Sequence, residues 1–229
     1  MCNRYRPATV TYIRDVFGFT LLEEPEPYAT SGIGPLQRGP FVRAGTLVTG
    51  QWGLIPWFSK TRRPTGKAGQ AISTNNCRIE TVATAPSFQA AWKRGQRCLI
   101  PAVDYDEPFW GSGRNVWWRF ARRDGEAWML GGLWSEWADP AGGETVASYT
   151  MLTQNCDGHP LLGLMHKPDP GLPPHEQDKR AVVPIERAEW DCWLNGTAEE
   201  ALALVRLPDA DMFVHGAAEP CFQGELPLG

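Results

Sequence analysis

A cysteine at position 2 is the residue of this sequence best suited to covalent chemistry. Methionine aminopeptidases remove an initiator methionine when the next residue is small, so we expect a mature chain that begins at Cys2. Its α-amine, with a reference pKa of about 7.7–8.0, and its thiol, with one of about 8.5, then form a 1,2-aminothiol. Such a group traps aldehydes, because the amine condenses to an imine and the thiol closes a five-membered thiazolidine ring on the imine carbon.

A polar segment in the first half of the chain could bind or orient a substrate for Cys2. It contains Asn75, Asn76 and Arg78, shortly before an expected helix. Amides and guanidinium groups bind phosphate or orient a substrate oxygen, and arginine does so with a planar fork. The same residue types also fit helix capping and surface roles, so the segment alone does not decide its function.

Candidates for proton transfer lie in two other segments. An expected apolar strand that ends near Pro101 is followed by an acidic turn with Asp104, Asp106 and Glu107. Partial burial raises the pKa of such a carboxyl group toward neutral pH, which suits general acid–base catalysis. The residues alone do not distinguish the three acids. His166, in a later loop, could move protons near neutral pH.

The composition is that of a globular chain with one good-sized core. The chain has 229 residues, of which 42% are hydrophobic and 21% charged. No apolar run approaches the roughly 18 residues of a membrane span, and no apolar signal region follows Met1. The six cysteines are scattered and the four histidines are not at zinc-ligand spacing. We therefore expect reduced cysteines, a cytoplasmic location, no membrane association, no cofactor and no metal.

Charge is unevenly distributed along the chain. The formal net charge is −4, but six acidic residues and only Arg206 follow position 196, so residues 1–196 carry about +1. Basic residues of this larger part are clustered and could follow a phosphate backbone, although solvated charges are the commoner explanation. The clusters are Arg4 and Arg6; Lys60, Arg62, Arg63 and Lys67; Lys93, Arg94 and Arg97; and Arg119, Arg122 and Arg123.

The pattern of apolar residues predicts short strands with few helices. Gly and Pro, 24 and 20 residues, favour turns over a helical bundle. Long loops are expected over 23–45 and 166–177, and helices after Pro86, over 186–194 and, from the capping box of Thr197 and Glu200, over 198–206. Expected strands are 47–52, 97–101, 116–121, 128–134, 148–154 and 180–183. These elements predict a curved, mostly antiparallel sheet or an open barrel.

Taken together and in order, several segments resemble the SOS-response-associated peptidase (SRAP) family, whose members protect abasic sites in single-stranded DNA. The resemblance covers about residues 2–195, nearly all of the chain outside its acidic tail. The matching segments are Met1–Tyr5, Trp52–Trp57, Asn76–Thr81, Arg97–Ala102 with Glu107, Met165–His166 and Asp178–Arg180.

The resemblance implies an α+β fold, with one compact domain around a curved, barrel-like sheet and flanking helices. The catalytic domain would span 2–195, and 196–229 would form a C-terminal helix and acidic tail. Cys2 would be the nucleophile, forming a covalent thiazolidine crosslink with the ring-opened abasic sugar. Asn76 would hold the sugar or its phosphate, while Glu107 and His166 would transfer protons. We expect a monomer whose partner is single-stranded DNA.

Family resemblance also implies a set of DNA-binding residues. Arg4 and Arg78 would bind backbone phosphate, and Trp57, Lys60 and Arg62 would lie along the strand. Exposed aromatic side chains can stack on bases. We expect Trp52 to lie in the core and leave Trp57 open. Other tryptophans are assigned to packing, including Trp117, Trp118, Trp128, Trp134 and Trp137.

The sequence departs from the common family pattern in three places. Asn3 stands where glycine is usual, and Glu107 is identified only by counting from Pro101. About eleven Pro-rich residues separate His166 from the Asp178–Arg180 segment. His159 therefore stays open as a substitute for His166, as does Asn75 for Asn76.

Two other functions compete with this interpretation. An N-terminal-nucleophile amidohydrolase or peptidase would also use Cys2, but it needs an oxyanion hole and usually has glycine next. The family is named for a cysteine peptidase, and an accompanying abasic lyase activity stays open. A non-catalytic single-stranded DNA-binding module would instead bind reversibly and in a salt-sensitive way, without the Cys2 thiol.

Overall fold

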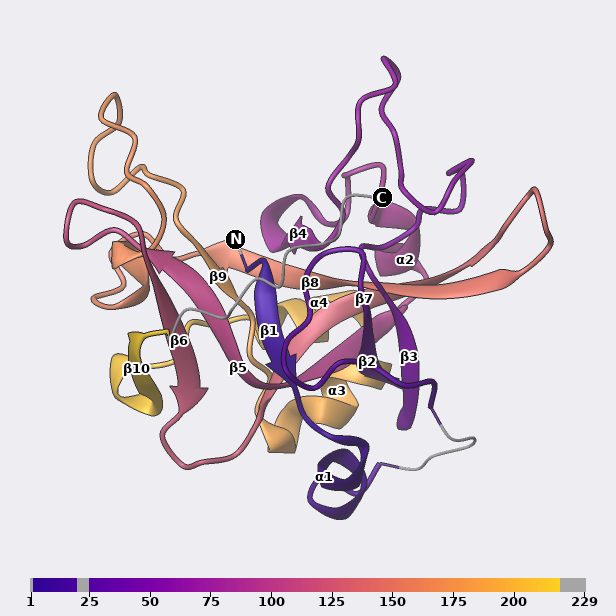
Figure 1. Ribbon diagram of the computed structural model, residues 1–229, viewed down its shortest axis with the longest axis horizontal. Coiled ribbons are helices and arrows are strands. Elements are labelled where there is room, and N and C mark those ends of the chain that lie inside the picture. The colour runs from indigo at the N-terminus through magenta and orange to yellow at the C-terminus, as the bar shows by residue number, and fades with distance from the viewer. Residues whose placement is uncertain (1, 20–24, 219–229) are drawn as a thin grey trace, which may run out of the picture.

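The computed structural model describes residues 2–19 and 25–218. Its centre is a closed ring of five strands, which are β2 (Arg38–Arg43), β3 (Thr46–Trp52), β8 (Thr145–Asn155), β7 (Trp128–Ala138) and β5 (Arg97–Phe109). The ring closes because β5 pairs with both β2 and β7 (Figure 1). Closure leaves none of these five strands as a free edge of the ring.

Five more strands extend this ring within the described residues. β6 (Val116–Arg122) pairs with β5, and β10 (Phe213–Ala217) pairs with β6. β4 (Asn76–Arg78) and β9 (Arg180–Val182) both pair with β8. Among the strand pairs of residues 2–19 and 25–218, only β3–β8 and β4–β8 are parallel. The expected α+β fold around a curved, mostly antiparallel, barrel-like sheet is confirmed.

The first strand determines where Cys2 lies. β1 (Arg4–Pro7) runs antiparallel to β5, with Arg4 opposite Asp106 and Tyr5 opposite Tyr105. The Tyr5 and Tyr149 hydroxyls, 2.5 Å apart, join β1 to β8 as well. Cys2 precedes Arg4 by two residues, so this register directs it toward the part of β5 that holds Glu107.

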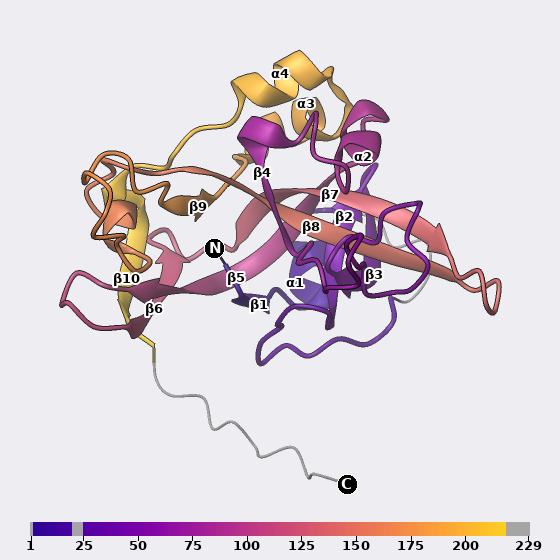
Figure 2. The same ribbon diagram turned by 90° about the horizontal axis from the view of Figure 1, so that it is seen from above.

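Short helices cover one side of the sheet. Figure 2 shows α2 (Gln89–Lys93), α3 (Trp190–Asn195) and α4 (Ala198–Ala203) together on that side, away from α1 (Val10–Asp15). Trp92 and Trp193 from these helices enter a buried apolar cluster with strand residues. Thr197 and Glu200 form the expected capping box, although α4 ends at Ala203 rather than near 206.

Two expectations about the strands were wrong in extent. The acidic stretch after Pro101 is not a turn, because β5 continues to Phe109. Its two aspartates are neutralised by arginines of neighbouring strands: Asp104 pairs with Arg6, and Asp106 with Arg4 and Arg119. The expected loop 23–45 contains β2, whose apolar residues pair with β3. The loop expected over 166–177 holds no helix or strand.

The tryptophan assignments hold for the core and fail at one position. Trp52, Trp128 and Trp137 are buried, whereas Trp117 is 46% exposed. Trp117 of β6 lies opposite Pro108 of β5. Successive side chains of a strand point to opposite faces, so Trp117 points outward while Trp118 points to the other face. No helix of the described residues is long and apolar enough to cross a membrane.

The C-terminal part beyond position 196 adds β10 to the sheet, while residues 219–229 of the expected acidic tail lie outside the described residues. The boundary between 195 and 196 stays a prediction.

Candidate functional site

Cys2 is held in a fully buried position by backbone and amide contacts. Its thiol donates a hydrogen bond to the carbonyl oxygen of Arg4 at 3.4 Å. Its own carbonyl oxygen accepts hydrogen bonds from Nδ2 of Asn76 at 2.7 Å and from Nδ2 of Asn75 at 3.4 Å. Burial, and then the negative charge of Glu107, raises the pKa of the Cys2 thiol well above its usual value. The nucleophile candidate is therefore a neutral thiol in a fixed place.

Two neighbouring asparagines, the residue before β4 and the first residue of β4, both donate to the Cys2 carbonyl oxygen. Asn75 is itself held, because its carbonyl oxygen accepts hydrogen bonds from the Trp52 indole and the Met151 amide. Its side chain also donates to Oδ1 of Asn3 at 3.1 Å, so the residue that departs from the family pattern takes part in the arrangement. Oδ1 of Asn76 is buried and has no hydrogen-bond partner among the described residues. An acceptor of this kind is available to a donor on a substrate.

Glu107 is the acid of the 104–107 stretch whose charge acts on the Cys2 thiol. Asp104 and Asp106 point to the other face of β5, where they bind arginines. Burial raises the pKa of Glu107 from 4.5 to about 7. Near neutral pH this carboxyl group therefore exists in both protonation states, as a group that both accepts and donates protons requires.

His166 meets Glu107 from a separate loop. Nε2 of His166 lies 3.3 Å from Oε2 of Glu107 and 3.1 Å from the carbonyl oxygen of Arg180. The Arg180 carbonyl oxygen can only accept a hydrogen bond, so the neutral ring carries its proton on Nε2. Burial lowers the pKa of His166 to about 4, which keeps the imidazole neutral at pH 7. The His166 imidazole is therefore a neutral hydrogen-bond donor beside the Glu107 carboxyl group, which is partly protonated near pH 7.

The backbone of His166 is fixed in an uncommon conformation. Its φ of 60° lies in the left-handed region, which few non-glycine residues occupy. The His166 amide donates to the carbonyl oxygen of Pro108 at 2.6 Å, and the ammonium group of Lys179 binds the His166 carbonyl. These contacts direct the imidazole toward Glu107.

The alternative histidine has a different environment. Nε2 of His159 contacts the carbonyl oxygen of Pro208 at 2.9 Å, and its Nδ1 accepts from the amides of Leu161 and Leu162. This imidazole ties a loop to the C-terminal segment. His166, and not His159, is the histidine beside Glu107.

The predicted DNA-binding residues fall into two groups. Arg4 lies in β1 with its Nε 2.9 Å from Asp106, and the half-exposed Arg78 in β4 forms an ion pair with Asp178. Arg4 lies two residues after Cys2 in the sequence, and Arg78 lies two residues after Asn76. Trp57, Lys60 and Arg62 lie instead in the long loop between β3 and β4.

That loop exposes an aromatic pair. The Trp57 side chain is 66% exposed and packs edge-on against Phe58, with ring centroids 5.8 Å apart. Trp57 is therefore a surface residue, which decides the question that the sequence left open. Arg62 pairs with Glu144 of the β7–β8 hairpin.

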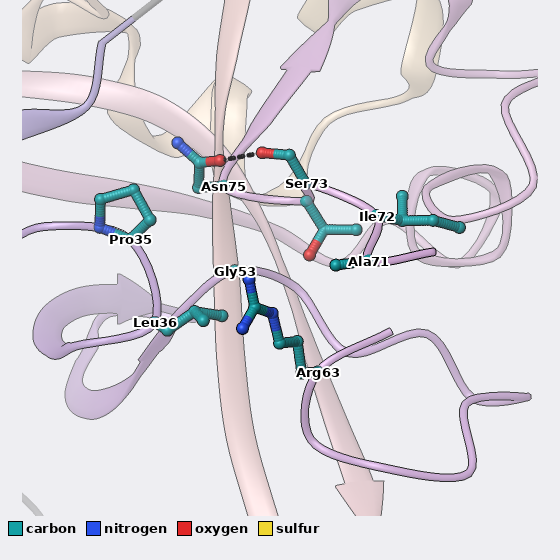
Figure 3. Close-up of a pocket in the computed structure, with 9 residues that line it drawn as sticks. Pro35, Leu36, Gly53, Arg63, Ala71, Ile72, Ser73 and Asn75 are labelled. Atoms are coloured by element: carbon teal, nitrogen blue, oxygen red, sulfur yellow. Dashed lines mark hydrogen bonds between the residues drawn. The ribbon is translucent and has the colours of Figure 1, made fainter. Parts of the chain in front are cut away.

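A pocket of about 220 Å³ is lined by Asn75, whose side chain also donates to the Cys2 carbonyl oxygen. Figure 3 shows the guanidinium group of Arg63 beside Leu36 and Gly53, with Ser73 bound to Asn75. Oγ1 of Thr74, another lining residue, is buried and has no hydrogen-bond partner among the described residues. Sequence reasoning counted Arg63 only within a basic cluster and missed Thr74, which no local pattern distinguishes from other loop threonines.

Metal ligands do not gather in the structure. Within residues 2–19 and 25–218, no group of three or more His, Cys, Asp or Glu side chains is placed to hold a metal ion. The nucleophilic and acid–base side chains that meet at this site are Cys2, Glu107 and His166.

Comparison with known families agrees with the segments that meet at Cys2. The family described as SOS response associated peptidase (SRAP) matches residues 1–217. This chain belongs to the SRAP family. The match includes β10 and therefore extends past the segment 2–195 on which the resemblance was first based.

Curated relatives of this SRAP chain are named abasic site processing protein HMCES. The protein from Xenopus tropicalis is 27% identical over an alignment of 146 residues that covers 55% of this chain and 41% of the relative. The protein from Pongo abelii is 24% identical over an alignment of 195 residues that covers 73% of this chain and 51% of the relative. The chain thus spans about half the length of these relatives.

Solved structures share the fold of this SRAP chain. A crystal structure of a protein from Bordetella bronchiseptica has a TM-score of 0.80 and 31% identity, covering 96% of this chain and all of the other. A protein from Bacteroides thetaiotaomicron has a TM-score of 0.74 at 16% identity, with 94% and 91% covered, and supports the fold alone.

Proposed function

We propose that this chain captures abasic sites in single-stranded DNA as a covalent DNA–protein crosslink through Cys2, after removal of Met1. One observation carries the proposal. The residue that would provide a 1,2-aminothiol is held by Asn76 next to a carboxyl group with a pKa of about 7. SRAP membership and relatives named for abasic site processing support the same substrate.

The reaction balances without a cofactor. The α-amine of Cys2 attacks C1′ of the ring-opened sugar, and the aldehyde oxygen leaves as water to give an imine. Sγ of Cys2 then adds to C1′, and the thiol proton passes to the nitrogen. A thiazolidine results, one water is released, and no atom is oxidised or reduced.

Glu107 and His166 would divide the proton transfers. The Glu107 carboxylate accepts a proton from the Cys2 ammonium group and returns it to the departing oxygen. Nε2 of His166, which carries a hydrogen at neutral pH, donates to the sugar oxygen as the ring opens. The unpartnered Oδ1 of Asn76 would accept a hydrogen bond from a sugar hydroxyl. These roles require three side chains from β4, β5 and the His166 loop within reach of one atom.

Single-stranded DNA fits this site better than duplex. Reaching C1′ in a duplex requires the nucleotide to be unstacked and turned out, which a single strand does not. Arg4 and Arg78 would bind the phosphates beside the lesion, because they continue the segments that hold Cys2 and Asn76. Trp57, Lys60 and Arg62 would guide the strand further away, with Trp57 available for stacking on a base.

A denaturing gel tests the proposal. Purified protein without Met1 is mixed with a labelled single-stranded oligonucleotide that carries one abasic site. We expect a shifted band that survives denaturation for the unaltered chain and is absent for Cys2→Ala. Both Cys2→Ala and Cys2→Ser retain the α-amine, so each should give a band only after borohydride reduction of its imine. Cys192→Ala removes a cysteine of α3 and should crosslink normally.

A shifted band with Cys2→Ala but without reductant would contradict the thiazolidine. Absence of any band with Met1 removed would contradict the proposed function and direct attention to amide and peptide hydrolysis.

A further inference from the structure

The Pro-rich insertion that follows His166 forms one wall of a second pocket. This pocket has a volume of about 340 Å³ and lies between the insertion and the end of β5. Figure 1 draws the insertion in orange, close to the β5–β6 hairpin. The lining residues that matter here are Trp110, Leu164, His166, Leu172, Pro174 and Lys179.

Hydrogen bonds hold the insertion in shape. The side chain of Gln177 donates to the carbonyl oxygens of Asp169, Leu172 and Pro173 at 2.8–3.1 Å. It also accepts from the Asp169 amide at 2.6 Å. At its far end, the backbone amides of Asp178 and Lys179 bind the Asp157 carboxylate at 2.9 Å each. Because the wall is already ordered, a ligand loses little affinity to the ordering of the loop.

The pocket presents apolar and aromatic surface that the described residues leave uncovered. Leu164 and Leu172 are each 45% exposed, which is high for leucine. Trp110 forms the flat part of the lining, and its backbone amide binds the carbonyl oxygen of Leu164 at 3.0 Å. A flat ring placed against this indole and these leucines would bury apolar area.

Positive charge lies at the edge of this apolar surface. The ammonium group of Lys167 lies 5.8 Å from the centroid of the Trp110 ring. Lys179 also lines the pocket, although it is engaged with the His166 carbonyl. A ligand with a flat ring and an anionic group matches this combination, and a nucleotide has both.

His166 joins the pocket to the reaction centre. It lines the pocket, while its Nε2 lies 3.3 Å from the carboxylate of Glu107. An abasic sugar that reacts between Cys2 and Glu107 would therefore place an adjoining nucleotide at the mouth of the pocket.

We propose that the pocket formed by Trp110, Leu164 and the insertion binds the nucleobase next to the abasic site, with Lys167 at its phosphate. The proposal rests on the function proposed above and deepens it. The insertion is one of the three places where this chain departs from the family pattern, so the pocket would give this chain its own dependence on the neighbouring base. Trp110 and Leu172 would be specificity-determining residues that contact the substrate outside the reacting atoms.

The test combines protein variants with altered oligonucleotides. Three abasic oligonucleotides are compared: one with bases on both sides of the lesion, and two in which the 5′ or 3′ neighbour is a reduced, base-free spacer. For each, the DNA concentration at half-maximal crosslinking rate and the maximal rate are measured. Trp110→Ala and the milder Leu172→Ala are the pocket variants. Trp117→Ala, an exposed tryptophan of β6 outside the pocket, is the matched control.

We expect one spacer to raise the half-maximal concentration of the unaltered chain at least about fivefold, as the loss of one stacked base would. Trp110→Ala should raise it similarly with the normal oligonucleotide and show no further loss with that spacer, because the two changes remove one contact. Leu172→Ala should show a smaller version of this coupling. Trp117→Ala should remain as sensitive to the spacer as the unaltered chain.

Two results would overturn the pocket assignment alone. These are an unaltered chain that ignores both spacers, and pocket variants whose losses simply add to those of the spacer. In both of these results the unaltered chain still forms the crosslink. If the proposed function itself is wrong, none of the oligonucleotides forms a crosslink, and both proposals are then contradicted.

Discussion

At the scale of single residues, burial gives Glu107 and His166 opposite roles. Desolvation raises the pKa of the carboxyl group to about 7 and lowers that of the imidazole to about 4. At neutral pH the imidazole is therefore a neutral donor, while the carboxyl group exchanges protons. The 3.3 Å separation between Nε2 and Oε2 lets the two groups act on the same substrate oxygen.

The pH dependence of crosslinking tests this assignment. As pH rises through about 7, Glu107 loses its proton and can accept one from the Cys2 amine, so the rate should rise. In Glu107→Gln this midpoint should move up toward the amine's own pKa of about 8, with a lower plateau. Single-turnover crosslinking rates between pH 5.5 and 9 measure the midpoint and the plateau of each profile. An unchanged midpoint in Glu107→Gln would remove Glu107 from the proton transfers.

At the scale of elements, the site depends on how far β5 extends. The apolar pattern predicts a strand that ends at Pro101, because proline and three acids interrupt it. The strand continues because Arg4, Arg6 and Arg119 of neighbouring strands neutralise Asp104 and Asp106. Such pairings join residues far apart in the chain, so local patterns did not reveal them. The motifs indicated which residues meet, but not that Glu107 lies within a strand.

Strand packing around the ring makes a glycine of β7 essential to the fold. A Cβ at Gly132 would lie 2.4 Å from the carbonyl oxygen of Thr150 in β8, a backbone atom with little freedom to move. Gly132→Ala should lower the free energy of unfolding by about 1–3 kcal/mol, as overpacking does. Gly142→Ala, at the end of the same hairpin with open space around it, should change it little. Urea denaturation compares the two, and equal effects would contradict the packing account.

At the scale of the whole molecule, closure of the barrel brings distant segments to one place. Four separate segments supply the site. Cys2 lies just before β1, Asn76 in β4, Glu107 in β5 and His166 in a loop after β8. Individual strands could be predicted from their apolar residues, and most were found near the expected positions. The order of the strands in the sheet could not be predicted, because the β3–β8 and β2–β5 pairings join segments about 50 to 100 residues apart in the sequence. β2 was missed for a different reason, because its Gly39 and Pro40 are residue types typical of loops.

The charge of the whole chain also shapes its binding to DNA. With a net charge of −4, affinity must come from local arginines and lysines rather than from a general positive field. Reversible binding of Cys2→Ala to single-stranded DNA should therefore weaken with salt, and Arg78→Ala should reduce the log–log slope by about 0.7, the value for one phosphate contact. Arg14→Ala, in α1, should leave the slope unchanged. Fluorescence anisotropy between 50 and 300 mM salt measures it, and an unchanged slope for Arg78→Ala would exclude its phosphate contact.

The mass of the crosslinked species tests the central claim most directly. Intact mass spectrometry of the product with an abasic oligonucleotide would identify both the protein end and the bond. We predict the mass of the chain from Cys2 onward plus that of the oligonucleotide, less one water. Peptide mapping should place the adduct on Cys2. An adduct that retains Met1, maps to another residue or is absent altogether would contradict the account.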